Sequence, residues 1–386
     1  MLGRGLVGAA ILVYLIVLGC VMLPSQAPAK KLSTEGTNSG DAANGGSPAS
    51  RGANPAFAGA LPFKGAAMQI QRVDWIDKYK QSIDEIASQG FDTVSLVLDT
   101  RQEDAESSRI YIDMRMTPTP EKLSELIQHA KGKGLRVILM PVVLLDVPKK
   151  DWRGVIRPEW WPDWFESYKN MLIHFAWIAQ QNKVDVLSVG SELVSSEKER
   201  GEWTKVIRAV REVFKGQLTY SANWDHYTSI PFWDQLDLIG MNSYYKLGDD
   251  RNVKVEEVVS RWKEIQKDLL AFQRKVGKPI LFLEIGWCSL ENAAHEPWDY
   301  TKRELDEDPE LQKKLYEGFF RAWYKEPGLG GFMVWEWTPG DGGKATAGPD
   351  GREPTKEQAE ELRKGYTPEN KPAQEVIQQW LAKPWK

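Results

Sequence analysis

Two glutamates stand at the ends of apolar runs that have the composition of buried strands. Glu192 follows the run VDVLSVGS of residues 184–191, and Glu284 ends the run PILFL of residues 279–283. A glycine lies close to each glutamate, which lets backbone or a ligand approach. A pair of carboxyl groups can cleave a glycosidic bond when one is protonated and the other is ionised. A separation of about 5–5.5 Å between them fits a double displacement, and about 6.5–9.5 Å fits inversion through a water molecule.

Aromatic and amide side chains follow other apolar runs in the same way. Asn223 and Trp224 follow residues 218–222, Tyr244 and Tyr245 follow residues 236–242, and Trp335 ends residues 331–335. A tyrosine hydroxyl beside an attacking carboxylate would donate to it and keep it ionised. The chain has 17 Trp, and such rings can stack on sugar faces, although a tryptophan-rich core is the alternative explanation.

The apolar runs alternate with amphipathic stretches after residue 62. Strands are predicted at 65–70, 93–98, 137–143, 184–189, 218–222, 236–242, 280–285 and 331–335. Helices are predicted near 74–89, 120–133, 161–181, 198–214, 255–276, 309–325 and 369–382. Strands that are apolar on both faces and separated by helices indicate a parallel sheet, and eight of them predict an α/β fold, a closed (β/α)₈ TIM barrel. The link between the fifth and sixth strands is short, so we expect it to be irregular.

Both glutamates occupy the end of such a barrel where its chemistry takes place. The carboxyl ends of the strands carry the active site in this fold. Glu192 and Glu284 are 92 residues apart, which corresponds to three strand–helix units of about 31 residues in a barrel of about 250. They are therefore expected on the fourth and seventh strands, facing each other across the mouth.

The N-terminal part of the chain is predicted to lie outside the barrel. Residues 1–23 form an apolar segment that fits a signal peptide, a lipoprotein signal with acylation at Cys20, or an uncleaved membrane anchor. Residues 24–61 are rich in Ser, Gly, Ala, Pro and Asn, which favours a flexible linker. Residues 62–386 then form one catalytic domain. We expect an exported protein in the extracellular space or cell envelope, with membrane contact only through residues 1–23.

The composition of the chain limits the classes of ligand that we expect. The net charge of −4 shows no basic excess, so nucleic acid is not expected as a ligand. Four His residues without ligand spacing give no prediction of a metal site or another cofactor. We expect a monomer whose ligand is a polysaccharide or oligosaccharide.

Several motifs in a fixed order resemble those of a known family. They are DWRGVI (151–156), VGSEL (189–193), YSANW (220–224), DLIGMNSYY (237–245), LEIGW (283–287), PWDY (297–300), VWEW (334–337) and NKPA (370–373). The chain resembles the clan A retaining glycoside hydrolases and, more closely, glycoside hydrolase family 113, which is known for β-1,4-mannanase activity. The resemblance spans about residues 63–382.

The resemblance implies a role for each matching residue. Glu192 would be the general acid/base and Glu284 the nucleophile, with Tyr244 as the donor to Glu284; Tyr245 remains an alternative for that role. The implied or predicted substrate contacts are Trp152, Asn223, Trp224, Tyr245, Trp287 and Trp335, with Trp335 as the sugar platform.

One position departs from the clan pattern. Clan A enzymes usually carry Asn directly before the acid/base, where its amide binds the 2-hydroxyl of the reacting sugar, and this chain has Ser191. A serine would need a water molecule or another neighbour to make that contact.

The sequence thus predicts a retaining hydrolase of a β-linked polysaccharide, with endo-β-1,4-mannan favoured by the resemblance alone. The residues themselves do not separate mannan from glucan or xylan. The alternative is a tethered, non-catalytic carbohydrate-binding or cell-envelope protein that kept the barrel; the presence of both glutamates argues against it.

Overall fold

The structure is a computed structural model that describes residues 61–146, 151–302, 304–340 and 355–385. The predicted export segment (1–23) and the predicted linker (24–61), apart from Leu61, lie outside the described residues. Among the residues described, no helix has the length and apolar character needed to span a membrane.

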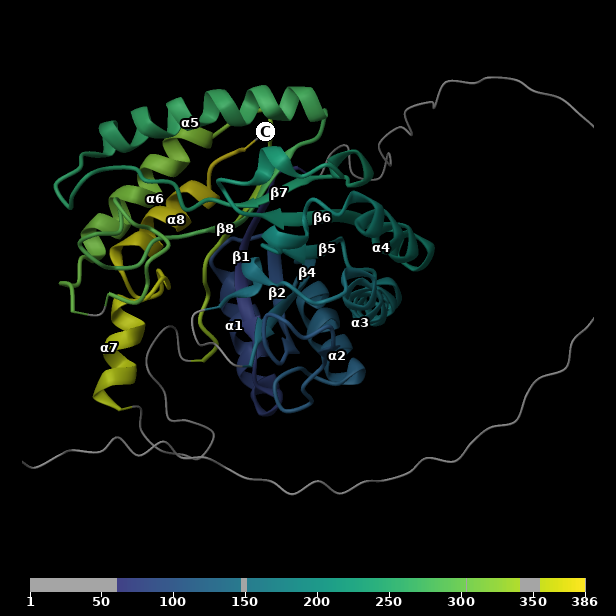
Figure 1. Ribbon diagram of the computed structural model, residues 1–386. Helices are drawn as coiled ribbons and strands as arrows, with labels where there is room; N and C mark the ends of the chain where they lie inside the picture. Colours follow the sequence, from purple (N-terminus) through teal and green to yellow (C-terminus); the bar gives the residue numbers. More distant parts are fainter. Residues whose placement is uncertain (1–60, 147–150, 303, 341–354, 386) are drawn as a thin grey trace, which may run out of the picture. The chain divides into compact units, whose positions relative to one another are not determined.

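Eight parallel strands form a closed barrel (Figure 1). They are β1 (Phe63–Ile70), β2 (Thr93–Gln102), β4 (Arg136–Leu145), β5 (Val186–Ser191), β6 (Gln217–Ala222), β7 (Ile239–Asn242), β8 (Ile280–Ile285) and β9 (Leu329–Val334). Each strand pairs with the next, and β1 pairs with both β2 and β9, which closes the sheet. The predicted (β/α)₈ barrel is confirmed, and each of its strands overlaps a predicted run.

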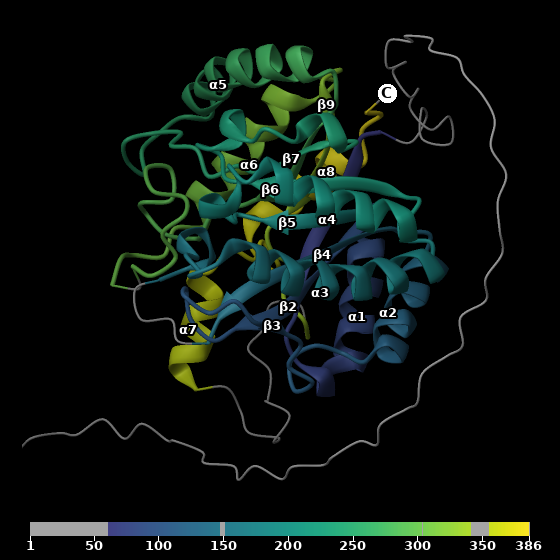
Figure 2. The same cartoon turned by 45° about the vertical axis from the view of Figure 1, so that its right-hand side comes forward.

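The helices lie outside the strands, as Figures 1 and 2 show. They are α1 (Ile76–Ser88), α2 (Pro120–Gly132), α3 (Trp161–Gln181), α4 (Arg200–Val213), α5 (Val255–Val276), α6 (Pro309–Trp323), α7 (Lys356–Lys364) and α8 (Pro372–Leu381). Four of them carry Pro in the first turn, where its missing N–H costs nothing. Thr119 and Asp308 cap α2 and α6 by accepting backbone N–H groups.

Two elements were not predicted. β3 (Ile110–Tyr111) pairs antiparallel with the end of β2, and α7 is a short helix of mostly charged residues. The link between β6 and β7 contains only the 3₁₀ turns η5 (Tyr227–Ser229) and η6 (Trp233–Gln235). The expected irregular connection is confirmed.

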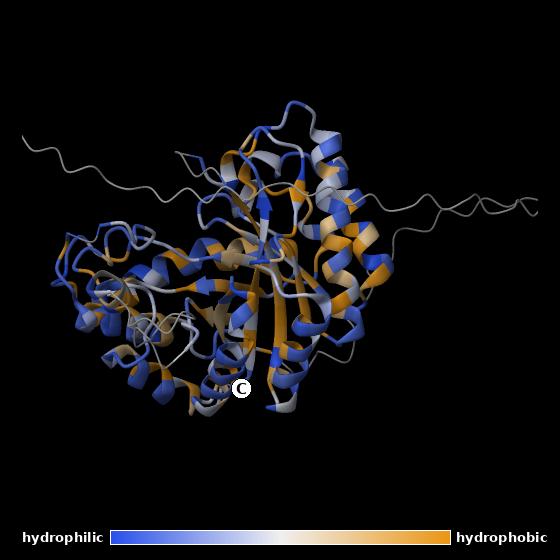
Figure 3. Cartoon of the chain, turned by 90° about the horizontal axis from the view of Figure 1, so that it is seen from below, coloured by the Kyte–Doolittle hydropathy of each residue, from blue (hydrophilic) through white to orange (hydrophobic). Residues whose placement is uncertain are grey.

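Apolar side chains fill both faces of the barrel wall. One buried cluster fills the interior and includes Val97, Val142, Leu283 and Met333. A larger cluster lies between the strands and the helices, and Figure 3 shows hydrophobic strands at the centre with hydrophilic residues on the surrounding helices. Six tryptophans are among the largest fully buried side chains: Trp164, Trp203, Trp262, Trp287, Trp323 and Trp337. A tryptophan-rich core thus accounts for much of the high Trp count.

Candidate active site

Glu192 is the first residue after β5, at the mouth of the barrel. Its backbone φ of 53° lies in the left-handed region, which is strained for a residue with a side chain and is common at functional sites. The Glu192 N–H donates to the carbonyl of Ser221 at 2.9 Å. This bond to the end of β6 holds the turn that presents the carboxylate.

Two donors hold the Glu192 carboxylate. Arg153 Nη2 donates to Oε2 at 2.5 Å, and Asn242 Nδ2 donates to Oε1 at 2.6 Å. The amide of Asn242 is itself oriented by Ser221, whose hydroxyl donates to Asn242 Oδ1 at 2.6 Å. Glu192 therefore has a charged donor on one oxygen and a fixed neutral donor on the other.

Glu284 lies within β8 and has different surroundings. Its side chain is buried, and Tyr244 Oη donates to Oε2 at 2.6 Å. Burial, followed by the negative charge of Glu192, raises the pKa of Glu284 to about 8. The hydrogen bond from Tyr244 and, to a smaller extent, the charge of Arg153 lower the pKa of Glu284 in opposition.

Asn242 connects the two glutamates. It is the Cα partner of Glu284 in the pairing of β7 with β8, while its side chain reaches Glu192. Both carboxylates therefore belong to one site. Glu284 lines a cavity of about 70 Å³ together with Arg153, Trp335 and Asp99.

The hydrogen bonds of Tyr244 and Tyr245 show which of the two donates to Glu284. Tyr244 reaches Glu284, whereas Tyr245 Oη donates to the carbonyl of Trp224 at 3.1 Å. Trp224 stacks on Trp298 with ring centroids 5.9 Å apart, and Trp298 is 45% exposed. Tyr244 is thus the donor to Glu284, and Tyr245 supports an aromatic pair.

The other predicted substrate contacts fall into different settings. Trp335 lines the cavity beside Glu284, and Trp152 is 42% exposed next to Arg153. Asn223 is half-buried directly after β6. Trp287 has no exposed surface and packs edge-on against Tyr316 with centroids 5.0 Å apart. In contrast to the prediction, Trp287 is a core residue in this structure, because its ring offers no free face to a sugar.

Several polar residues of the site were not predicted. Arg153 and Asn242 contact Glu192, and Gln69 donates to Glu336 on the wall beside the cavity. Asn242 could have been found because it directly ends a strand run. Arg153 lies in the 3₁₀ turn η3 (Arg153–Val155). The sequence around it has no helical or strand periodicity from which the direction of its side chain could be predicted.

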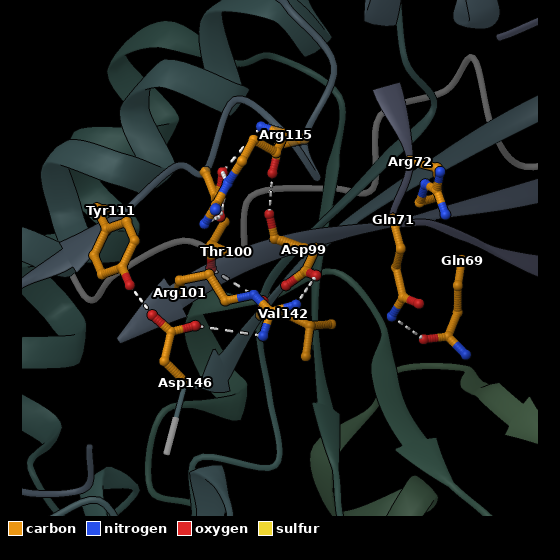
Figure 4. A network of polar contacts seen from close by, with 12 residues as sticks. Gln69, Gln71, Arg72, Asp99, Thr100, Arg101, Tyr111, Arg115, Val142 and Asp146 are labelled. Atoms are coloured by element: carbon orange, nitrogen blue, oxygen red, sulfur yellow. Dashed lines mark hydrogen bonds and ion pairs between the residues drawn. The ribbon is translucent and has the colours of Figure 1, made fainter. Parts of the chain in front are cut away.

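A second polar group lies at the end of β2. Figure 4 shows the Arg101 guanidinium between the carboxylates of Asp99 and Asp146, with Gln69 and Gln71 beside them at the end of the neighbouring strand β1. Burial raises the pKa of Asp99, and Arg101 opposes that rise. No group of His, Cys, Asp and Glu suited to holding a metal ion occurs among the residues that the structure describes.

The chain is similar to known glycoside hydrolases in sequence and in fold. A model of Glycoside Hydrolase Family 113 matches residues 67–350. A solved β-1,4-mannanase of that family is 25% identical, with a TM-score of 0.72 over 84% of this chain and 100% of its own. The β-mannanase of Alicyclobacillus acidocaldarius is 27% identical, with a TM-score of 0.71 over 84% of this chain and 98% of its own.

A more distant likeness concerns the fold alone. The β-glucuronidase of Faecalibacterium prausnitzii is 14% identical, with a TM-score of 0.52 over 84% of this chain and 49% of its own. No curated protein matches the chain. The family match covers most of the barrel and includes both glutamates. The chain belongs to glycoside hydrolase family 113 and is a glycoside hydrolase.

Proposed function

We propose that this enzyme cleaves internal β-1,4 bonds of mannan by double displacement, with Glu284 as nucleophile and Glu192 as acid/base. One observation carries the proposal: Asn242 joins the two carboxylates at one barrel mouth, because its side chain donates to Glu192 while its backbone pairs with that of Glu284. Two neighbouring carboxylates of this kind do not both ionise readily. They can therefore hold the single proton that the reaction needs.

The first half of the reaction uses the two groups in opposite ways. Glu284 attacks the anomeric carbon while Glu192 gives its proton to the departing sugar oxygen. In the second half Glu192 takes a proton from water, which attacks the same carbon and releases Glu284. Tyr244 donates to Glu284 at 2.6 Å, so its hydroxyl stabilises the carboxylate before attack and again when it departs.

Burial favours the protonated form of Glu284, whereas the reaction requires this carboxyl group to be ionised. The hydrogen bond from Tyr244 lowers the pKa of Glu284 and so favours the form that attacks.

The choice of mannan is supported by the solved relatives, both described as mannanases, at 25% and 27% identity. Trp335 beside Glu284 is the platform for the reacting sugar, and the exposed Trp152 and stacked Trp224 extend the aromatic surface.

A pair of alanine variants tests both roles. The full chain is first assayed on soluble mannan, xylan and mixed β-glucan, and the anomer released is followed by NMR; release of the β-anomer is expected. Glu284→Ala and Glu192→Ala are then given an aryl β-mannoside with a good leaving group, together with azide. Azide fills the space left by Glu284 and forms the α-azide, whereas with Glu192→Ala it attacks the glycosyl-enzyme and forms the β-azide.

Opposite products would overturn the assignment of the two roles. An α-anomer released first by the unchanged enzyme would establish inversion instead. Binding of mannan without any hydrolysis would favour a carbohydrate-binding protein that has lost its chemistry.

We also propose that the enzyme works as a monomer outside the cytoplasmic membrane. Residues 1–23 either tether it to the membrane or are cleaved to release it. The apolar run and the following polar stretch of residues 24–61 support the export of the barrel. Cell fractionation with mass spectrometry of Cys20 tests this: an acylated Cys20 indicates a lipoprotein, and a cytoplasmic, uncleaved chain would contradict export. Sedimentation of the purified enzyme measures its oligomeric state.

A further inference from the structure

Asp99 is a buried carboxylate at the mouth of the barrel that the reaction described above does not use. It lies on β2 two residues after Val97, which belongs to the cluster inside the barrel. Because side chains alternate along a strand, Asp99 faces the same way as Val97, one layer nearer the mouth. Only 2% of Asp99 is exposed.

Among the described residues, one oxygen of the Asp99 carboxylate has a hydrogen-bond donor and the other has none. Arg101 Nη2 donates to Oδ2 at 2.5 Å, and Arg101 Nη1 reaches Asp146 at 3.5 Å (Figure 4). Thr117 donates to the backbone carbonyl of Asp99 and so fixes the strand end. Within the described part of the chain, no group donates to Asp99 Oδ1, although this oxygen is buried.

The cavity beside Asp99 is the one that contains the nucleophile. Asp99, Glu284 and Trp335 line it together. A sugar whose anomeric carbon lies at Glu284 must bring its hydroxyl groups against this wall. A hydroxyl is a donor of the right size for a buried carboxylate oxygen, and a bond to a charged acceptor is stronger than one between neutral groups.

The side chains at the end of the neighbouring strand β1 already have partners. Gln71 donates to Gln69 Oε1 at 2.8 Å, and Gln69 donates to Glu336. Both groups of the Gln69 amide are thus engaged, whereas Asp99 Oδ1 is a buried acceptor without a hydrogen-bond donor among the described residues.

We propose that Asp99 binds a hydroxyl of the sugar that rests on Trp335 and thereby selects for its position. This inference rests on the proposed hydrolase function and names a binding residue for it. Arg101 positions the carboxylate by holding Oδ2, which leaves Oδ1 for the substrate.

The test compares Asp99→Asn with Asp146→Asn in the full-length enzyme. Asp146 contacts the same Arg101 from the other side, with Tyr111 as a further partner, and does not line the cavity. The substrates are an aryl β-mannoside and its monodeoxy analogues at C2, C3, C4 and C6. Asp99→Asn is expected to lower kcat/KM by about 10- to 100-fold, and Asp146→Asn by less than about 3-fold.

The deoxy analogues identify the contact. With the unchanged enzyme, the analogue that lacks the bound hydroxyl should show about the same fall in kcat/KM as Asp99→Asn shows with the full sugar. In Asp99→Asn, removal of that hydroxyl should lower kcat/KM little further. Equal losses in the two Asn variants, or equal sensitivity to every analogue with and without Asp99, would overturn the proposal. If Asp99→Asn does not fold, as judged by its Tm, then Asp99→Ser and the deoxy series with the unchanged enzyme take its place. An unchanged enzyme that tolerates all four analogues also overturns it.

Failure of the proposed function gives a different result. An enzyme without activity on any β-glycan contradicts the hydrolase assignment itself. An active enzyme that is indifferent to Asp99→Asn contradicts only the role of Asp99.

Discussion

The two glutamates of the site are the same residue type in two different surroundings. Glu192 sits just beyond β5 on a strained turn, with Arg153 and Asn242 donating to its two oxygens. Glu284 sits inside β8, where burial raises its pKa to about 8 and the neutral Tyr244 is its donor. The difference comes from position in the barrel: a residue past the strand end can reach loop residues, and a residue within the strand is enclosed by its neighbours.

That asymmetry is what double displacement requires. A pair of carboxyl groups in equal surroundings would share a proton without preference, and neither would be prepared for attack or for proton transfer. Here a change on one side of the pair alters the other through charge. Variants of either glutamate and of the residues that donate to them therefore test this coupling.

Glu192→Gln removes the proton donor and one charge. Hydrolysis of mannan is expected to fall by about 10²- to 10⁴-fold, while the first step on a dinitrophenyl glycoside, which needs no protonation, is largely retained. The charge of Glu192 raises the pKa of Glu284, so the acidic limb of the pH profile for that step should move to lower pH. Stopped-flow release of dinitrophenol from pH 4 to 9 measures both effects. A limb that stays in place would show that the two groups are not coupled.

Glu284→Gln is expected to stabilise the fold in alkaline solution. The pKa of Glu284 rises from 4.5 to about 8 on folding, so the folded state binds the proton more tightly than the unfolded state. The stability that this gives in acid is lost as pH rises from about 5 to 8, because the buried group must then ionise. Between pH 5 and pH 8, the free energy of unfolding of the unchanged enzyme should fall by about 2–4 kcal/mol more than that of Glu284→Gln.

Urea unfolding at both pH values measures this difference, and Glu369→Gln is the matched control. Glu369 is buried and does not line the cavity of Glu284; it accepts the Thr338 N–H at 2.8 Å and has a pKa raised to about 8 by burial. It should show the same trend with pH while activity remains. Identical unfolding curves for Glu284→Gln and the unchanged enzyme at pH 8 would contradict the raised pKa of Glu284.

Tyr244→Phe removes the donor to Glu284 and leaves the ring in place. Because that bond lowers the pKa of Glu284, its loss should move the acidic limb of kcat/KM to higher pH, opposite to the effect of Glu192→Gln. Activity at pH 7 is expected to fall about 10- to 100-fold. Tyr245→Phe is the control, since its hydroxyl contacts the Trp224 carbonyl and not Glu284. A shift of equal size in both variants would mean that the Tyr244 bond has no specific effect.

The sequence contained enough information for the barrel and for its two central residues. Strands buried on both faces read as unbroken apolar runs, and α3 and α5 begin and end where their apolar periods do. Glu192 and Glu284 could be found because each is attached to such a run. The short helix α7 has few apolar residues and thus no stripe to detect.

The residues that tune the glutamates were harder to find for a physical reason. Arg153 comes from a loop, and its approach to Glu192 depends on how that loop packs over the mouth. Trp287 is predicted as a substrate contact but is buried in the core. A tryptophan near the mouth fits a sugar-binding groove and a core equally well. Its contact with Tyr316 of α6 decides for the core, and the spacing of residues along the chain does not contain that contact.

Ser191→Ala changes the residue next to Glu192 and is expected to have the smallest effect. The Ser191 hydroxyl is buried and has no hydrogen-bond partner within the described ranges, while Asn242 holds the adjacent Glu192. Removing a buried hydroxyl without a protein partner loses no protein hydrogen bond, so stability should change by less than about 0.5 kcal/mol and kcat/KM by less than about 3-fold. A loss above about 10-fold on a full sugar, absent with its 2-deoxy analogue, would instead assign to Ser191 the contact that clan A enzymes make with Asn.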